Sequence, residues 1–193
     1  MARIARLDGR QQALDAATRL FYEQGHESVS VETVAQAAGL TKKALYYHFP
    51  TKTDLVLATL EAAQGPVLAQ LCRMARLDAP SDTHPFDRIL QGMHKWLKSG
   101  RFRGCMFLCA AKSYPDVPEV VAHAAQQKAA TLAWLETVAR DHGAANPRKL
   151  ALEFRLLLDA IFATGHLYDA DDLIATARGM LAEQLASAAP RRR

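Results

Sequence analysis

Apolar residues recur three and four positions apart along most of the chain, and no stretch shows the strict alternation of a half-buried strand. We therefore expect an all-α protein of about nine helices. The pattern predicts longer helices over residues 8–24, 51–76, 86–99, 119–142, 148–168 and 171–188. It also predicts two short helices within 31–49 and another short one over 105–112.

The signals that end and begin helices are clearest around the second and third of these. Gly39 stands where the second helix must stop, and Thr41 is placed to cap the third. Pro50 then breaks the chain, and Thr51 with Asp54 forms a variant of the capping box that opens the fourth helix. The pattern predicts a helix-turn-helix followed directly by a long helix, which Gly65 and Pro66 could kink.

The third helix has one apolar and one polar face. Leu45 and Phe49 continue an apolar seam from Val34 and Ala38, while the other face carries hydrogen-bond donors. The run AxxAGLxxxxLYYHFxxKxxL resembles the TetR family of bacterial transcriptional regulators, closely from Arg10 to about Ala62. The resemblance implies a helix-turn-helix DNA-binding domain over residues 1–55, and an effector-binding and dimerisation domain over residues 56–193.

An exposed, donor-rich helix of this kind can enter the major groove of double-stranded operator DNA. Residues near its start would reach base edges and phosphates. The resemblance implies that Tyr46, His48 and Lys52 contact phosphates. The predicted DNA-binding residues are Thr33, Thr41, Lys42, Lys43, Tyr46, Tyr47, His48 and Lys52. Arg3 and Arg6 would either reach the adjacent minor groove or form a solvated tail, as Arg191–Arg193 does at the other end.

The last two helices are apolar on more than one side. Such a helix needs partners on several sides, and in the resembled family these helices form a four-helix interface between two copies. The alternative is the core of a monomeric bundle. The predicted interface residues of a homodimer are Leu150, Phe154, Leu158, Ile161, Leu173 and Leu181, with Leu152, Leu156 and Ala160 extending the apolar surface around the helix.

The middle helices are rich in aromatic residues and methionine. This composition fits a cavity for a small apolar or aromatic effector with one or two polar groups, although such stripes are more often plain core. The predicted effector-binding residues are Met93, Trp96, Phe102, Met106, Cys109, Trp134, Phe162 and His166.

Composition and cysteine spacing add little to this interpretation. The net charge of +4 and the pI of about 9.1 favour an anionic partner. Cys72, Cys105 and Cys109 show no CxxC spacing, which favours reduced thiols in the cytoplasm, and Cys105 with Cys109 could serve as a thiol sensor, as half of a metal site or as two buried apolar residues.

The sequence shows no pattern that predicts a cofactor, a metal site, catalysis or contact with a membrane. No apolar run approaches the roughly 20 residues of a membrane span. We therefore predict a homodimeric regulator, most simply a repressor that a small molecule releases from its operator. The alternative is a helical small-molecule-binding protein or enzyme whose N-terminal hairpin is incidental.

Overall fold

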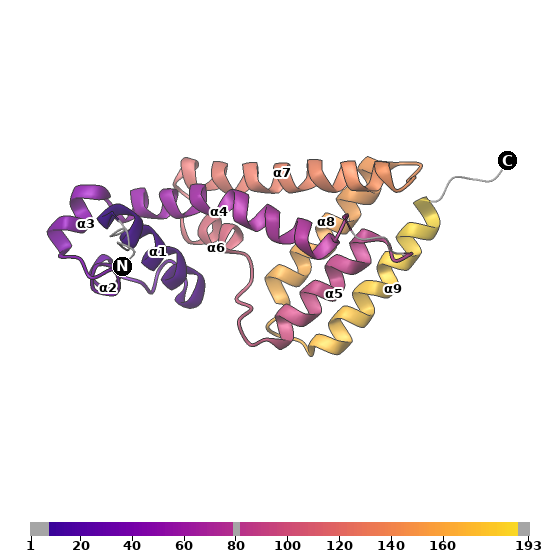
Figure 1. The fold of residues 1–193 in the computed structure, drawn as a ribbon, viewed down its shortest axis with the longest axis horizontal. Helices are drawn as coiled ribbons and strands as arrows, with labels where there is room; N and C mark the ends of the chain where they lie inside the picture. Colours follow the sequence, from indigo (N-terminus) through magenta and orange to yellow (C-terminus); the bar gives the residue numbers. More distant parts are fainter. Residues whose placement is uncertain (1–7, 79–81, 189–193) are drawn as a thin grey trace, which may run out of the picture. The chain divides into compact units, whose positions relative to one another are not determined.

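The computed structural model describes residues 8–78 and 82–188, and these residues form nine helices and no strand. The all-α prediction is therefore confirmed for the described part of the chain. Arg3, Arg6 and Arg191–Arg193 lie outside the described residues. The helices are α1 Gly9–Gln24, α2 Val31–Ala37, α3 Lys42–His48, α4 Lys52–Ala75, α5 Pro85–Lys98, α6 Met106–Ser113, α7 Pro118–Asp141, α8 Pro147–Thr164 and α9 Ala170–Ala188 (Figure 1).

The chain divides into two compact units. The first comprises Met1–Gln64 and Met106–Ala125, and the second comprises Gly65–Cys105 and Gln126–Arg193. The long helices α4 and α7 therefore each contribute to both units. The predicted domain limits at residues 55 and 56 stay a prediction.

In the first unit, α1, α2 and α3 pack together around an apolar core. Leu14, Ala17, Leu20 and Phe21 are buried on α1, as the helical spacing predicted. Two side-chain pairs connect the segment Met106–Ala125 to other parts of the first unit, one at His26 and one at Gln64 of α4. His26 lies edge-to-face against Tyr114, with ring centroids 6.4 Å apart, and Gln64 Nε2 lies 3.1 Å from His123 Nδ1.

In the second unit, α5 and α8 both pack against α9 (Figure 1). Phe86 of α5 stacks on Phe154 of α8, with ring centroids 4.2 Å apart and planes at 5°. Arg178 of α9 donates to both carboxylate oxygens of Asp87 on α5, at 2.5 and 3.0 Å. An aromatic core and a bidentate ion pair therefore hold these helices in register.

One predicted helix is too long. α8 ends at Thr164 rather than at Tyr168. Gly165 N–H still donates to the Ile161 carbonyl at 2.8 Å, but Leu167 N–H donates to the Thr164 carbonyl at 2.8 Å, which closes a tighter turn than a helix does. Only glycine fits at the start of this turn, because an added Cβ at Gly165 would come within 2.6 Å of the Ile161 carbonyl and 2.9 Å of Leu97 Cδ2. The chain turns at this close approach, and Asp169 then accepts from the N–H groups of Asp171 and Asp172 at the start of α9.

α4 also corrects the sequence analysis. It is one helix of 24 residues with Pro66 in its interior. By length and composition it could cross a membrane, since an 18-residue window has a mean hydropathy of 1.3 and 33% of that window is buried. The expectation that no run is long and apolar enough was therefore wrong. A core helix of a soluble protein passes the same test, and the first turns of α4 bury Leu55, Val56 and Leu60.

Candidate nucleic-acid interface

The turn between α2 and α3 is fixed by backbone and side-chain hydrogen bonds. Gly39 has φ of +67°, which favours glycine, and Leu40 N–H donates to the Ala35 carbonyl at 2.9 Å. Thr41 caps α3, because its hydroxyl accepts from Ala44 N–H at 3.1 Å. Ser30 caps α2 in the same way by accepting from Thr33 N–H at 3.1 Å. The sequence signals at Gly39 and Thr41 therefore act as predicted.

The capping box at the start of α4 is also present. Thr51 N–H donates to Asp54 Oδ2 at 2.9 Å, and Asp54 N–H donates to Thr51 Oγ1 at 3.0 Å. This reciprocal pair begins α4 at Lys52, and only Phe49, Pro50 and Thr51 separate α4 from the end of α3 at His48. Local hydrogen bonds therefore define where α3 begins and where α4 begins.

The turn aims a set of polar side chains toward solvent. Leu45 and Phe49 are buried, whereas Tyr47 is 84% exposed and Tyr46 is 39% exposed. Thr33, Thr41, Lys42 and Lys43 are also exposed. These six predicted DNA-binding residues therefore share the solvent-exposed surface of α2 and α3, where a duplex could reach them.

His48 and Lys52, the other two predicted DNA-binding residues, are half-buried. His48 packs edge-to-face against Tyr47 at 5.3 Å, and its Nε2 would lie 3.2 Å from a Cβ added at Gly9. Lys52 Nζ donates to the Glu27 carbonyl at 3.3 Å, and burial lowers the pKa of this ammonium. His48 therefore packs within α3 and close to Gly9 at the start of α1, whereas Lys52 ties the start of α4 to the segment between α1 and α2.

Three interactions around α3 were not predicted from the sequence. The Lys42 ammonium pairs with the Glu32 carboxylate of α2, and it also lies 5.8 Å from the centre of the Tyr46 ring. The Arg10 guanidinium lies 5.2 Å from the centre of the Phe49 ring. Opposite charges at the starts of two adjacent short helices are a weak signal that could have suggested the first contact.

The predicted effector-binding residues separate into the two units. Trp96, Phe102 and Phe162 form an aromatic cluster in the second unit, with ring centroids 5.2 to 6.1 Å apart. In that unit Met93 is buried, Trp134 is half-buried and His166 is exposed; in the first unit Met106 is buried and Cys109 is exposed, both on α6.

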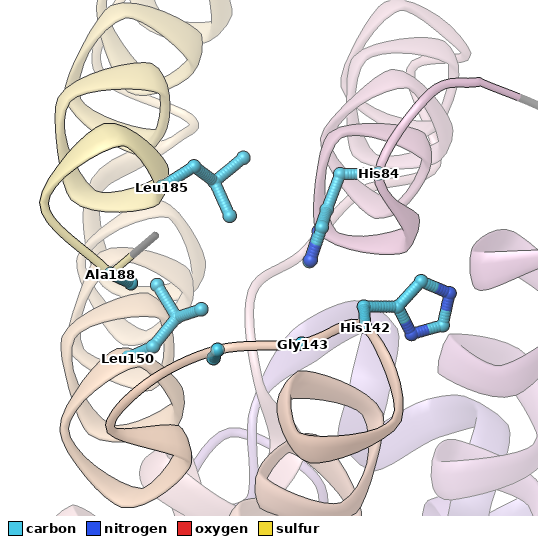
Figure 2. A pocket seen from close by; sticks show the side chains of 7 residues that line it. His84, His142, Gly143, Leu150, Leu185 and Ala188 are labelled. Carbon is cyan, nitrogen blue, oxygen red and sulfur yellow. The ribbon is translucent and has the colours of Figure 1, made fainter. Parts of the chain in front are cut away.

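A hollow in the second unit is lined by residues other than the predicted effector-binding residues. His84, His142, Leu150 and Leu185 line it, together with Gly143, Ala144 and Ala188 (Figure 2). His84 accepts from Phe86 N–H at 3.2 Å, and its pKa is lowered to about 4 by burial, by His142 and by Arg88. Its imidazole is therefore neutral near pH 7 and serves as the cap of α5.

The predicted interface residues lie mostly in the interior of the chain. Leu150, Phe154, Leu158, Ile161 and Leu181 are each at most 1% exposed, and Leu173 is half-buried. The first five therefore pack within their own chain. The exposed apolar side chains of this region are Leu152 (43%), Leu156 (61%), Leu167 (67%), Tyr168 (62%) and Met180 (48%).

None of the three thiols is part of a disulfide, and they lie in different environments. Cys72 is half-buried, Cys105 is buried and Cys109 is exposed. Lys128 Nζ lies 3.8 Å from Cys105 Sγ and donates to Asp159 at 2.5 Å. No group of three or more histidine, cysteine, aspartate or glutamate side chains that could hold a metal ion occurs among residues 8–78 and 82–188.

The helix-turn-helix segment is similar in sequence to known proteins. Residues 13–59 match the family described as "Bacterial regulatory proteins, tetR family". The transcriptional regulator AcrR of Shigella flexneri is 43% identical over 58 residues, which cover 30% of this chain and 27% of AcrR. The repressor BepR of Brucella suis is 32% identical over 81 residues, which cover 42% of this chain and 39% of BepR.

A solved structure extends the likeness to the whole fold. SCO4454, a TetR-family transcriptional regulator from Streptomyces coelicolor, superposes with a TM-score of 0.83 at 27% identity, and the alignment covers 94% of this chain and 96% of that one. The fold and the donor-rich third helix thus define a helix-turn-helix protein of the DNA-binding class. Residues 13–59 therefore form a domain of the TetR family of bacterial transcriptional regulators, and the fold of the chain is similar to that of a solved TetR-family regulator. The curated matches span well under two thirds of those relatives, and the relatives are regulators rather than enzymes.

Proposed function

We propose that the protein is a homodimeric repressor, which binds a near-palindromic operator in the cytoplasm and leaves it when a small effector binds. The observation that carries the proposal is the exposed donor face of α3, held by the capped turn at Gly39 and Thr41. Tyr47 is 84% exposed on that face, so its ring and hydroxyl are available to a partner.

The side chains divide by the chemistry that they offer to a duplex. Thr41, Lys42, Lys43 and Tyr47 would contact base edges and phosphates in the major groove, while Thr33 and Tyr46 would hydrogen-bond the phosphate backbone. His48 and Lys52, which both keep part of their surface exposed, would also contact phosphates.

The exposed leucines of α8 support a symmetric dimer. Leu152 and Leu156 are four residues apart, so they share one helical face, and each exposes more than a third of its surface. A second copy would cover this face and place two reading helices one helical turn of DNA apart, with centres about 34–36 Å apart.

The aromatic cluster supports an apolar or aromatic effector. Trp96, Phe102 and Phe162 offer ring faces and edges, and His166 could add a polar contact. The remaining predicted effector residues keep that role as part of the proposal. Release from DNA would follow if the effector binds more tightly to a dimer whose reading heads are wrongly spaced.

The test of DNA binding is fluorescence anisotropy on DNA from directly upstream of the gene and on a random duplex, over a salt series. For Lys43→Ala we expect weaker binding to both, and a plot of log affinity against log salt that is shallower by about 0.9 per subunit. Tyr47→Ala should instead change the ratio of affinities between operator variants by roughly tenfold.

The matched control is Lys95→Ala, which removes one exposed ammonium from α5 in the second unit and should leave the salt slope unchanged. A wild-type protein that binds upstream and random DNA equally would contradict the operator proposal.

The test of the effector is a screen of apolar and aromatic compounds by thermal shift, followed by operator release. A compound in the aromatic cluster should raise the melting temperature and quench emission from the chain's two tryptophans, Trp96 and Trp134. Trp96→Phe should abolish most of the quenching, because this ring lies 5.2 Å from Phe102, while Trp134→Phe should preserve it. Release only by highly charged metabolites or by a metal ion would count against an apolar effector.

A further inference from the structure

Glu32 holds a cation of the reading surface before any DNA arrives. The residue lies in the first turn of α2, and its carboxylate pairs with the ammonium of Lys42, the first residue of α3. Both side chains are more than half exposed, at 57% and 56%. The Lys42 ammonium also lies 5.8 Å from the centre of the Tyr46 ring, so it has a partner on each helix.

Several groups fix the carboxylate in this place. The hydrogen bond from Lys42 comes first among the causes that lower the pKa of Glu32, followed by a bond to its own backbone N–H, with a smaller contribution from the Ser30 hydroxyl. The pKa of Lys42 is raised in turn by Glu32. Both groups are therefore fully charged near pH 7, and together they contribute no net charge to the surface.

We propose that Glu32 is a specificity-determining residue, because it keeps Lys42 from gripping phosphates on DNA of the wrong sequence. The inference rests on the proposed function and concerns the same surface. On random DNA, Lys42 would spend more of its time paired with Glu32 than with phosphates, and the carboxylate would repel the phosphates. A duplex that presents an acceptor at the right place would compete better for the ammonium.

The energies involved suit such a role. An exposed ion pair is weak and screened by salt, so a well-placed acceptor in the groove can displace the carboxylate. A buried pair would be too costly to open. Since one free cation near the phosphates steepens the salt dependence by about 0.9 per subunit, freeing Lys42 should be visible on random DNA.

The experiment measures binding to the upstream fragment and to a random duplex over a salt series, by fluorescence anisotropy. Glu32→Gln should bind random DNA a few-fold more tightly per subunit, with a slope steeper by about 0.9 per subunit. Affinity for the upstream fragment should rise less, so the ratio of specific to random binding should fall. Lys42→Ala should weaken random binding, because it leaves the Glu32 carboxylate unpaired beside the phosphates. Glu32→Gln combined with Lys42→Ala should bind random DNA about as the wild type does, because both charges of the pair are then gone.

Glu23→Gln is the matched control, because Glu23 is an exposed carboxylate of α1 that pairs with Arg19 at 3.5 Å. An equal rise in random binding for Glu23→Gln and Glu32→Gln would overturn the proposal, since it would show a general effect of charge. A rise that persists in the double variant would overturn it too. If the wild type favours the upstream fragment and Glu32→Gln does not differ from it, only this inference fails; if the wild type shows no preference, the proposed function fails as well.

Discussion

Replacing Leu156 by glutamate should give a folded monomer that has lost at least a hundredfold in operator affinity. The Leu156 side chain is 61% exposed on α8 and has no role in the core of its own chain. A carboxylate there would have to be buried unpaired between two copies, which costs several kcal/mol. Sedimentation velocity would show the monomer, circular dichroism would show an unchanged helix content, and anisotropy would show the lost affinity.

Leu158→Glu is the informative comparison, since Leu158 is two residues away on the same helix and fully buried. Its carboxylate would lie in the core of the second unit, so we expect loss of cooperative unfolding and of native helix content. A folded Leu156→Glu dimer with normal operator binding would place the interface elsewhere on the chain.

Acidification from pH 7 to pH 4 should destabilise the protein by on the order of 3 kcal/mol through His26 alone. His26 is 1% exposed, and neither ring nitrogen has a hydrogen-bond partner. Burial, with a smaller contribution from the charge of Lys52, lowers its pKa from 6.5 to about 4. Between these values the unfolded chain binds more protons than the folded one, so stability is complete above pH 6.5 and falls as the pH falls. Urea unfolding at a series of pH values measures this.

His26→Phe should weaken the pH dependence, because phenylalanine can keep the stack on Phe21, whose ring centroid lies 5.0 Å away. Part of the dependence should remain, since His84 also has a pKa of about 4. An unchanged pH profile for His26→Phe would show that this imidazole is already protonated or already solvated in the folded protein.

The reading surface could be predicted from sequence because its signals are local. Gly39, Thr41 and the pair Thr51 and Asp54 each act on backbone groups within four residues, so their positions alone define where α3 and α4 begin. The exposure of Tyr47 follows from its place on the face of α3 opposite the buried Leu45, with the buried Phe49 directly after the helix.

The faces of α8 were harder to predict, because leucine occupies both. Leu150, Phe154 and Leu158 point inward while Leu152 and Leu156 point outward, and hydropathy alone does not distinguish them. Only the packing of α8 against α5 and α9 decides which row is core. The pairing of Lys42 with Glu32 was missed for a similar reason, since it depends on the angle between two helices rather than on spacing within one.

The outward leucines of α8 also bear on how much protein a cell has to make. In the proposed assembly, pairing covers Leu152 and Leu156 and stabilises only the folded state, so mass action makes the folded fraction rise with the number of copies. At low expression, single chains would expose these side chains to proteases and chaperones. The abundance of the regulator would then be set partly by its own survival, with scarce chains degraded faster than plentiful ones.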